Sequence, residues 1–203
     1  MDDTYKTVEG PAEGYITEKK SKFISFIFPV KSAVEVKEIV DAHRKKYYDA
    51  RHVCWAYMLG WEREESRVND DGEPSGTAGR PILGQINSAE LTDVLILVIR
   101  YFGGTLLGTG GLIKAYKEAS ADAIQHAEIV ERTVDEEIHI HFEYTLLNDV
   151  MRVLKQFETV RWTQDFQTSC RMTLRIRRSL SAQLKEMLAA IFGVEVAPQD
   201  KNA

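Results

Sequence analysis

An unbroken apolar run, Val94-Leu95-Ile96-Leu97-Val98-Ile99, constrains the fold of this chain more than any other segment. A strand with one solvated face alternates apolar and polar side chains, whereas a strand covered on both faces is apolar throughout. We therefore expect a central strand here, with other parts of the chain packed on both of its faces.

Strand and helix patterns alternate around this run. The β-rich segments 15–17 and 22–28 flank a charged turn, and 51–61 predicts a further strand on which the more polar 62–69 pairs as an edge. Ser32 begins a helix, with Glu35 at capping-box spacing. A short helix is expected over about 79–88 with Thr77 as its cap. A further helix is expected over roughly 111–127. It carries small residues that let it lie close to a sheet: Ala115, Ala119 and Ala123.

The pattern restarts near residue 133. A strand at 134–144 places four apolar side chains on one face, Ile138, Ile140, Phe142 and Tyr144. A helix at 145–157, strands near 158–165 and 168–177, a helix at 180–192 and a short strand at 194–196 follow. The order βαββαβ is that of a ferredoxin-like domain. The sequence therefore predicts an α+β protein with two domains, residues 1–133 and 134–203.

Composition narrows the class of protein. Of the 203 residues, 44% are hydrophobic and 28% charged, which is ordinary for a folded globular chain. The net charge of −5 lacks the basic excess of a nonspecific nucleic-acid binder, so any RNA contact would come from a local patch. Cys54 and Cys170 lie in alternating apolar runs, as small buried side chains do, rather than as a disulfide pair.

Neither a membrane span nor a secretion signal is expected. No stretch approaches the roughly 18 apolar residues of a spanning helix. The N-terminus, Met1–Thr4, is acidic and precedes no apolar signal core. We expect a cytoplasmic protein.

Five glycines separate the apolar strand from the following helix: Gly103, Gly104, Gly108, Gly110 and Gly111. Helix N-termini attract anions, and glycines let a phosphate or another backbone approach closely. Arg100 and Lys114 bracket the turn with positive charge, which favours an anion or phosphate-backbone site. The alternative, that the glycines only permit a tight strand-to-helix turn, stays open.

Known nucleotide-binding motifs do not match this glycine-rich segment, residues 103–111, which we call the second loop. Gly103 and Gly108 have Walker A spacing, but Thr109 follows where the motif needs lysine. A dinucleotide fingerprint starting at Gly108 meets Ile113 where its third glycine belongs. No cofactor is therefore expected.

The first loop, residues 70–81, combines carboxylates, hydroxyls, glycines and one arginine: Asp70, Asp71, Gly72, Glu73, Ser75, Gly76, Thr77 and Arg80. Carboxylates and hydroxyls together can serve general-base or metal chemistry. We favour instead a solvated acidic loop that ends in a helix cap, since no nucleophile–base pair stands at recognisable spacing.

The C-terminal part carries two further candidate surfaces. His139 and His141 alternate on one strand with Glu137 and Glu143, a set that could bind zinc. The strand 168–177 presents a polar row of Arg171, Thr173, Arg175 and Arg177, which has the charge but not the aromatic side chains of an RNA-binding sheet. Because the two strands are neighbours in a ferredoxin-like sheet, we favour cross-strand ion pairs over either site. No metal is expected.

Together, Asp70–Pro81 and Arg100–Gly111 resemble the two hallmark motifs of the IMPACT family, in its bacterial YigZ-type branch. His52 and Cys54-Trp55-Ala56-Tyr57 resemble a third family stretch, with Val53 where the common form has asparagine. The resemblance covers the whole chain. It implies an N-terminal domain like domain 2 of ribosomal protein S5 and a C-terminal domain like the final domain of elongation factor G. Eukaryotic relatives act in translational control.

We therefore expect a non-enzymatic, translation-associated regulatory protein that binds the ribosome, RNA or a protein partner through the two loops. The expected binding residues are those of the two loops named above, with Arg100, Tyr101 and Lys114. The alternative is a small hydrolase that uses Asp70, Asp71, Glu73 and Ser75. His52 is the only histidine near these motifs, and the sequence does not show that it reaches them.

Overall fold

The structure is a computed structural model that describes residues 3–157, 160–166 and 170–197. Residues 158, 159, 168 and 169, which belong to two predicted strands, lie outside the described residues. The chain divides into two compact units. The first is Tyr5–Arg132, and the second begins at Thr133 and includes Asp3 and Thr4.

The first unit is built on a five-stranded antiparallel sheet with the order β2-β3-β6-β4-β5. The strands are β2 (Ala12–Glu18), β3 (Ser21–Pro29), β4 (His52–Leu59), β5 (Glu65–Asn69) and β6 (Val94–Tyr101). The apolar run forms β6 at the centre of the sheet, and β5 pairs with β4 at the edge, as predicted.

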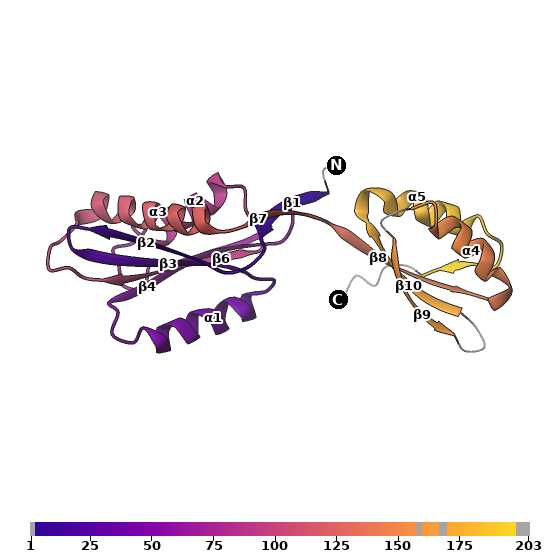
Figure 1. Ribbon diagram of the computed structural model, residues 1–203, viewed down its shortest axis with the longest axis horizontal. Coiled ribbons are helices and arrows are strands. Elements are labelled where there is room, and N and C mark those ends of the chain that lie inside the picture. The colour runs from indigo at the N-terminus through magenta and orange to yellow at the C-terminus, as the bar shows by residue number, and fades with distance from the viewer. Residues whose placement is uncertain (1–2, 158–159, 167–169, 198–203) are drawn as a thin grey trace. The chain divides into compact units, whose positions relative to one another are not determined.

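Helices cover both faces of this sheet (Figure 1). Helix α1 (Ala33–Lys46) lies on one face, and α2 (Gly79–Ser88) and α3 (Gly108–His126) lie on the other. The side chains of β6 alternate between the two cores: Leu95, Leu97 and Ile99 pack on the α1 side, and Val94, Ile96 and Val98 on the α2/α3 side. All six are fully buried, which explains the absence of polar alternation.

The predicted N-terminal cap is confirmed for α1 and is wrong for α2. Ser32 caps α1 by accepting the Glu35 N–H at 3.3 Å, as predicted. Helix α2 has its predicted bounds, but Thr77 is not its cap, because the Thr77 hydroxyl donates to the Pro74 carbonyl. The Asp70 carboxylate accepts the first N–H groups of α2 instead. A side chain nine residues upstream cannot be recognised as a cap from local spacing.

Helix α3 begins at Gly108, three residues before its expected start, and lies close to the sheet. Its Ala115, Ala119 and Ala123 are buried, and the Ser25 hydroxyl of β3 donates to the Ala119 carbonyl at 2.6 Å. The small side chains therefore allow the close helix–sheet approach that the sequence predicted.

Two short strands were missed. β1 (Thr4–Val8) pairs with β7 (Ile129–Thr133) in a two-stranded sheet. Both segments are short and largely polar, so neither contains a strong strand pattern.

The second unit has a four-stranded sheet with the order β11-β8-β10-β9 and two helices on one face (Figure 1). Its elements are β8 (Asp135–Phe142), the turn η1 (Tyr144–Leu146), α4 (Leu147–Leu154), β9 (Arg161–Phe166), β10 (Cys170–Arg177), α5 (Arg178–Ala189) and β11 (Glu195–Val196). In the order of the strands along the chain this is 4-1-3-2, the ferredoxin-like topology, so the α+β fold class is confirmed.

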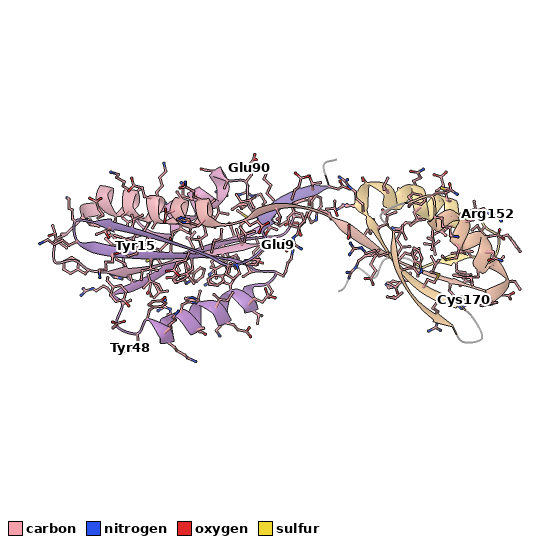
Figure 2. All side chains as sticks on the ribbon, viewed as in Figure 1. Glu9, Tyr15, Tyr48, Glu90, Arg152 and Cys170 are labelled. Carbon is pink, nitrogen blue, oxygen red and sulfur yellow. The ribbon has the colours of Figure 1, made fainter. Side chains whose placement is uncertain are left out.

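The core of the second unit follows the predicted alternation except at one position. Ile138, Ile140 and Phe142 are buried, but Tyr144 is 65% exposed because the strand ends and a 3₁₀ turn begins. Cys170 on β10 is buried, whereas Arg152 on α4 projects to solvent (Figure 2).

Asp3 belongs to this unit through its bonds. Its carboxylate accepts hydrogen bonds from Arg177 Nε at 2.8 Å and from the Ser179 N–H at 2.9 Å. These bonds hold the pKa of Asp3 well below its usual range. None of the helices in the described part of the chain is long and apolar enough to cross a membrane.

Candidate functional site

A cavity of about 500 Å³ lies where the two glycine-rich loops meet at one end of the five-stranded sheet. The start of β4 and the end of β6 form its base, since His52 and Arg100 are register partners across these strands. The lining is mostly apolar with a few charged groups: Arg51, His52, Gly72, Glu73, Pro74, Arg100, Phe102, Leu106, Leu107, Gly108, Thr109 and Leu112.

Asp70 organises the first loop from within. Its Oδ2 accepts the Gly76 N–H at 2.8 Å, and its Oδ1 accepts those of Ala78 at 3.1 Å and Gly79 at 2.8 Å. Burial alone would raise the pKa of Asp70, but the three backbone N–H groups stabilise the charged form and lower it. Asp70 therefore fixes the loop and caps α2.

Asp71 ties the same loop to the start of β4. Its carboxylate accepts the Val53 N–H at 2.7 Å and pairs with Arg44 at 2.6 Å. Its carbonyl oxygen lies 2.7 Å from Nδ1 of His52. The loop is thus anchored on the strand that supplies the base of the cavity.

Glu73 is buried in the cavity wall, with 8% of its surface exposed. Its Oε1 accepts from Arg100 Nη1 at 2.6 Å and from the Tyr116 hydroxyl at 2.7 Å. The expectation of a solvated acidic loop is therefore wrong. Asp70, Asp71 and Glu73 each bind groups of the protein itself, and Asp71 and Glu73 are paired with arginines.

Arg100 lies beneath the cavity rather than on the surface. Only 5% of the residue is exposed, and its guanidinium packs between the rings of Phe23 and Phe102, at 5.6 Å and 5.8 Å from their centroids. Its Nε is buried without a hydrogen-bond partner among the described residues. A macromolecular phosphate would reach this side chain only by entering the cavity.

The network continues into the core through Tyr116 and Cys54. The Cys54 thiol lies 3.3 Å from the Tyr116 hydroxyl and 3.0 Å from the Asp70 carbonyl oxygen. Burial raises the pKa of the Cys54 thiol and that of the Tyr116 hydroxyl. Both groups are therefore neutral hydrogen-bonding groups at physiological pH, which excludes Cys54 as a ready thiolate nucleophile.

His52 does reach the two motifs. Because a carbonyl oxygen only accepts, the bond to Asp71 places the proton of the neutral ring on Nδ1. Nε2 then carries the lone pair and lies 3.8 Å from Glu73 Oε1, which is too far for a hydrogen bond. The cavity therefore holds an oriented histidine that could accept a proton.

The glycines of the second loop fall into different classes. A Cβ at Gly103 would lie 2.1 Å from the carbonyl carbon of Lys20, so the close backbone approach requires glycine. Gly104 and Gly108 have φ of +86° and +70°, as a tight turn demands. Gly110, in the first turn of α3, has neither constraint: a Cβ there would meet nothing within 4 Å. The turn geometry alone does not explain Gly110.

The remaining predicted site residues lie around the cavity or away from it. Gly111 lies on the first turn of α3, and Ser75, Arg80 and Lys114 are exposed. Tyr101 does not join the site, because it faces the α1 side of the sheet and its hydroxyl donates to Asp49.

Sequence reasoning missed several residues of the cavity wall. They are Arg51, His52 and Pro74 and the apolar or hydroxyl side chains Phe102, Leu106, Leu107, Thr109 and Leu112. Phe102 is 45% exposed and Leu106 is 83% exposed, so two large apolar side chains of this loop face water. The sequence signal that could have identified Phe102 and Leu106 as wall residues is their large apolar side chains within a glycine-rich loop.

Exposed cations surround this end of the sheet. They are Lys19 and Lys20 beside Gly103, Lys22 opposite Tyr101, Arg51 beside Arg100, Arg80 at the start of α2, and Lys114 on α3. The acids of the same region are Glu18, Asp49, which accepts from Tyr101, and Glu118, which lies 3.7 Å from Lys114. The local surface is therefore basic although the whole chain is acidic.

In the second unit, the open face of the sheet pairs its own charges. Arg175 and Glu137 are register partners, with Nη2 3.6 Å from Oε2, which confirms the predicted cross-strand pairing for this one pair. His139 lies 3.3 Å from Glu137, and His141 lies 3.7 Å from Glu195 rather than near Glu143. The described residues contain no group of three or more His, Cys, Asp or Glu side chains arranged to hold a metal ion.

Comparisons with known proteins identify the family. The family model described as the Impact N-terminal domain matches residues 19–124. The IMPACT family member YvyE of Bacillus subtilis is 37% identical over 75% of this chain and 70% of its own length. The IMPACT family member YigZ of Escherichia coli is 32% identical over 84% of this chain and 85% of its own length. A crystal structure of a protein described as hypothetical is 27% identical, covers 99% of this chain and 100% of its own, and has a TM-score of 0.75. The chain belongs to the IMPACT family.

Proposed function

We propose that this protein is a translation-associated regulatory protein of the cytoplasm that binds an anionic partner, first of all ribosomal RNA, at the glycine-loop end of its N-terminal unit. The link to translation rests on the family, whose eukaryotic members act in translational control. The site is argued from the chemistry of the surface.

The observation that carries the proposal is the asymmetry of charge at this end of the sheet. The carboxylates of Asp70, Asp71 and Glu73 are bound internally, whereas the lysines and arginines around the loops are exposed. A local basic surface on an acidic chain attracts a polyanion in one orientation. Protein–RNA contacts of this kind depend on salt, because binding releases counterions.

The second loop adds features of a contact surface. Gly110 leaves open space on α3 at a position where alanine would favour the helix by roughly 1 kcal/mol. Phe102 and Leu106 expose apolar surface beside it. The open space at Gly110 and the exposed apolar side chains together favour a surface that a partner approaches closely. They are less expected of a turn with a purely structural role.

The test is co-sedimentation of the tagged chain with ribosomes from its own cell type. We expect binding that falls as salt rises and that weakens in the Arg80→Gln/Lys114→Gln variant, which removes one exposed cation from each loop. The matched control is Lys37→Gln/Lys45→Gln, which removes two exposed cations from α1 on the other side of the sheet. Equal loss in both variants, or no sedimentation at any salt, would contradict the proposal.

A second candidate, a small hydrolase, is favoured by one observation. His52 lines the cavity with Nδ1 bound to the Asp71 carbonyl oxygen, and a helix N-terminus that could stabilise a developing anion lines the same cavity. The predicted acid set does not support this candidate, because Asp70, Asp71 and Glu73 are bound internally and Ser75 is exposed. Assays with nitrophenyl esters, nitrophenyl phosphates and aminoacyl nitroanilides, with and without divalent metals, test it. Turnover lost in His52→Gln supports it, and no turnover removes it.

A further inference from the structure

The cavity between the loops carries an inference that goes beyond the proposed surface contact. We infer that it is a ligand site for a small monoanion with an apolar body, that is, an apolar carboxylate. The carboxylate would be that of a free organic acid or of the last residue of a peptide chain.

The charge of the cavity wall indicates an anion. Arg100 is 95% buried, lines the cavity and has an Nε without an acceptor among the described residues. Nε itself is closed to solvent, so an anionic group in the cavity would be favoured by the charge of this guanidinium rather than by a hydrogen bond from Nε.

The N-terminus of α3 points to the same place. Gly108 and Thr109, its first two residues, line the cavity, no side chain caps the helix, and its first turn holds no acidic residue. The first N–H groups of a helix of 19 residues remain free to bind an anion. The arginines of the wall and the uncapped helix are independent features that line one space.

The balance of charges favours a single negative charge. The two arginines of the wall, Arg51 and Arg100, against the one carboxylate, Glu73, give these three residues a net charge of +1. A phosphate monoester at pH 7 carries close to two negative charges and would lie beside the buried Glu73 carboxylate. A carboxylate carries one negative charge and so matches the wall.

The rest of the lining selects an apolar body. Pro74, Phe102, Leu106, Leu107 and Leu112 surround the charged groups. A volume of about 500 Å³ is within the range of small-molecule sites and holds an amino-acid-sized ligand with its side chain.

The experiment is an NMR titration of the ¹⁵N-labelled full chain with N-acetyl-leucine, compared with N-acetyl-leucinamide and with inorganic phosphate. We expect the amide signals of Gly108 and Thr109 to shift, with a dissociation constant on the order of 1 mM for a ligand of about a dozen non-hydrogen atoms. The uncharged amide should bind at least roughly tenfold more weakly, since it loses charge-assisted hydrogen bonds.

Variants localise the effect. Arg51→Gln should weaken N-acetyl-leucine binding about twofold to fivefold, as the loss of an exposed ion pair does. Lys45→Gln on α1 is the matched control and should leave it unchanged. Absence of shifts with the acid, equal shifts with the amide, or tighter binding of phosphate would overturn the inference.

Two further comparisons are needed. One distinguishes a free acid from a protein C-terminus, and the other distinguishes this inference from the proposed ribosome binding. A peptide ending in leucine that binds more tightly than N-acetyl-leucine identifies a protein C-terminus, and equal affinity identifies a free acid. Because the titration contains no ribosomes, it can fail while co-sedimentation succeeds, and the reverse.

Discussion

Replacing Glu73 by methionine would leave the Arg100 guanidinium buried without its counter-charge. Arg100 is 5% exposed, its Nε already has no acceptor among the described residues, and Glu73 Oε1 at 2.6 Å is the carboxylate oxygen that pairs with it. Removing one partner of a buried pair typically costs about 3–5 kcal/mol. We expect Glu73→Met to lower the free energy of unfolding of the N-terminal unit by this amount.

The double variant separates charge from packing. Glu73→Met/Arg100→Met removes both buried charges and leaves the Tyr116 hydroxyl as the group that has lost its carboxylate acceptor. An unsatisfied hydroxyl costs about 1–3 kcal/mol. The double variant should therefore be more stable than Glu73→Met alone, although it carries one more substitution.

Urea unfolding measures both values. Trp162→Phe serves as the background, so that fluorescence reports Trp55 and Trp61 of the N-terminal unit. Glu9→Met, which removes an exposed partner of Arg132, is the matched control and should cost about 1 kcal/mol or less. A cost below about 1 kcal/mol for Glu73→Met, or a double variant no more stable than Glu73→Met, would refute the buried-pair argument.

Three further predictions concern the glycines of the second loop, the Asp70 carboxylate and the two buried thiols. Gly110→Ala should stabilise the chain by roughly 0.5–1 kcal/mol, whereas Gly103→Ala should destabilise it through contact with backbone, and thermal unfolding of the two variants measures the difference. The lowered pKa of Asp70 contributes stability above pH 3.8 that is lost as pH falls through the folded-state pKa, so urea midpoints of wild type and Asp70→Asn should converge in acid; a constant gap would contradict this. Cys54 and Cys170 are buried, so a thiol reagent at pH 8 should label them only on unfolding; rapid labelling of the native chain would contradict the packing.

The fold could be predicted where the pattern is local. The apolar run of β6, the Ser32 cap of α1 and the alternation of β8 each depend on neighbouring residues. The first two are confirmed, and the third is confirmed as far as Phe142. The strands β1 and β7 could not be found, because their pairing joins segments more than 120 residues apart in the sequence and neither has a strong pattern of its own.

The site was located only in part, for the same reason. The sequence identified both loops and Arg100, but it could not show that Glu73 binds Arg100 across 27 residues, or that Asp70 caps α2 from nine residues away. These long-range bonds turn the carboxylates of the loop toward the protein, where Asp71 and Glu73 pair with arginines. The position of His52 beside the loops depends on the pairing of β4 with β6, which no local motif encodes.

The most direct test of the central claim is the slope of log K against log salt for ribosome binding, measured for wild type and for Arg80→Gln/Lys114→Gln. Each lost phosphate contact on single-stranded RNA should reduce the slope by about 0.7, so the variant should lose roughly 1.4. Lys37→Gln/Lys45→Gln should keep the slope of wild type. Equal slopes for all three proteins would contradict the assignment of the binding surface to the glycine-rich loops.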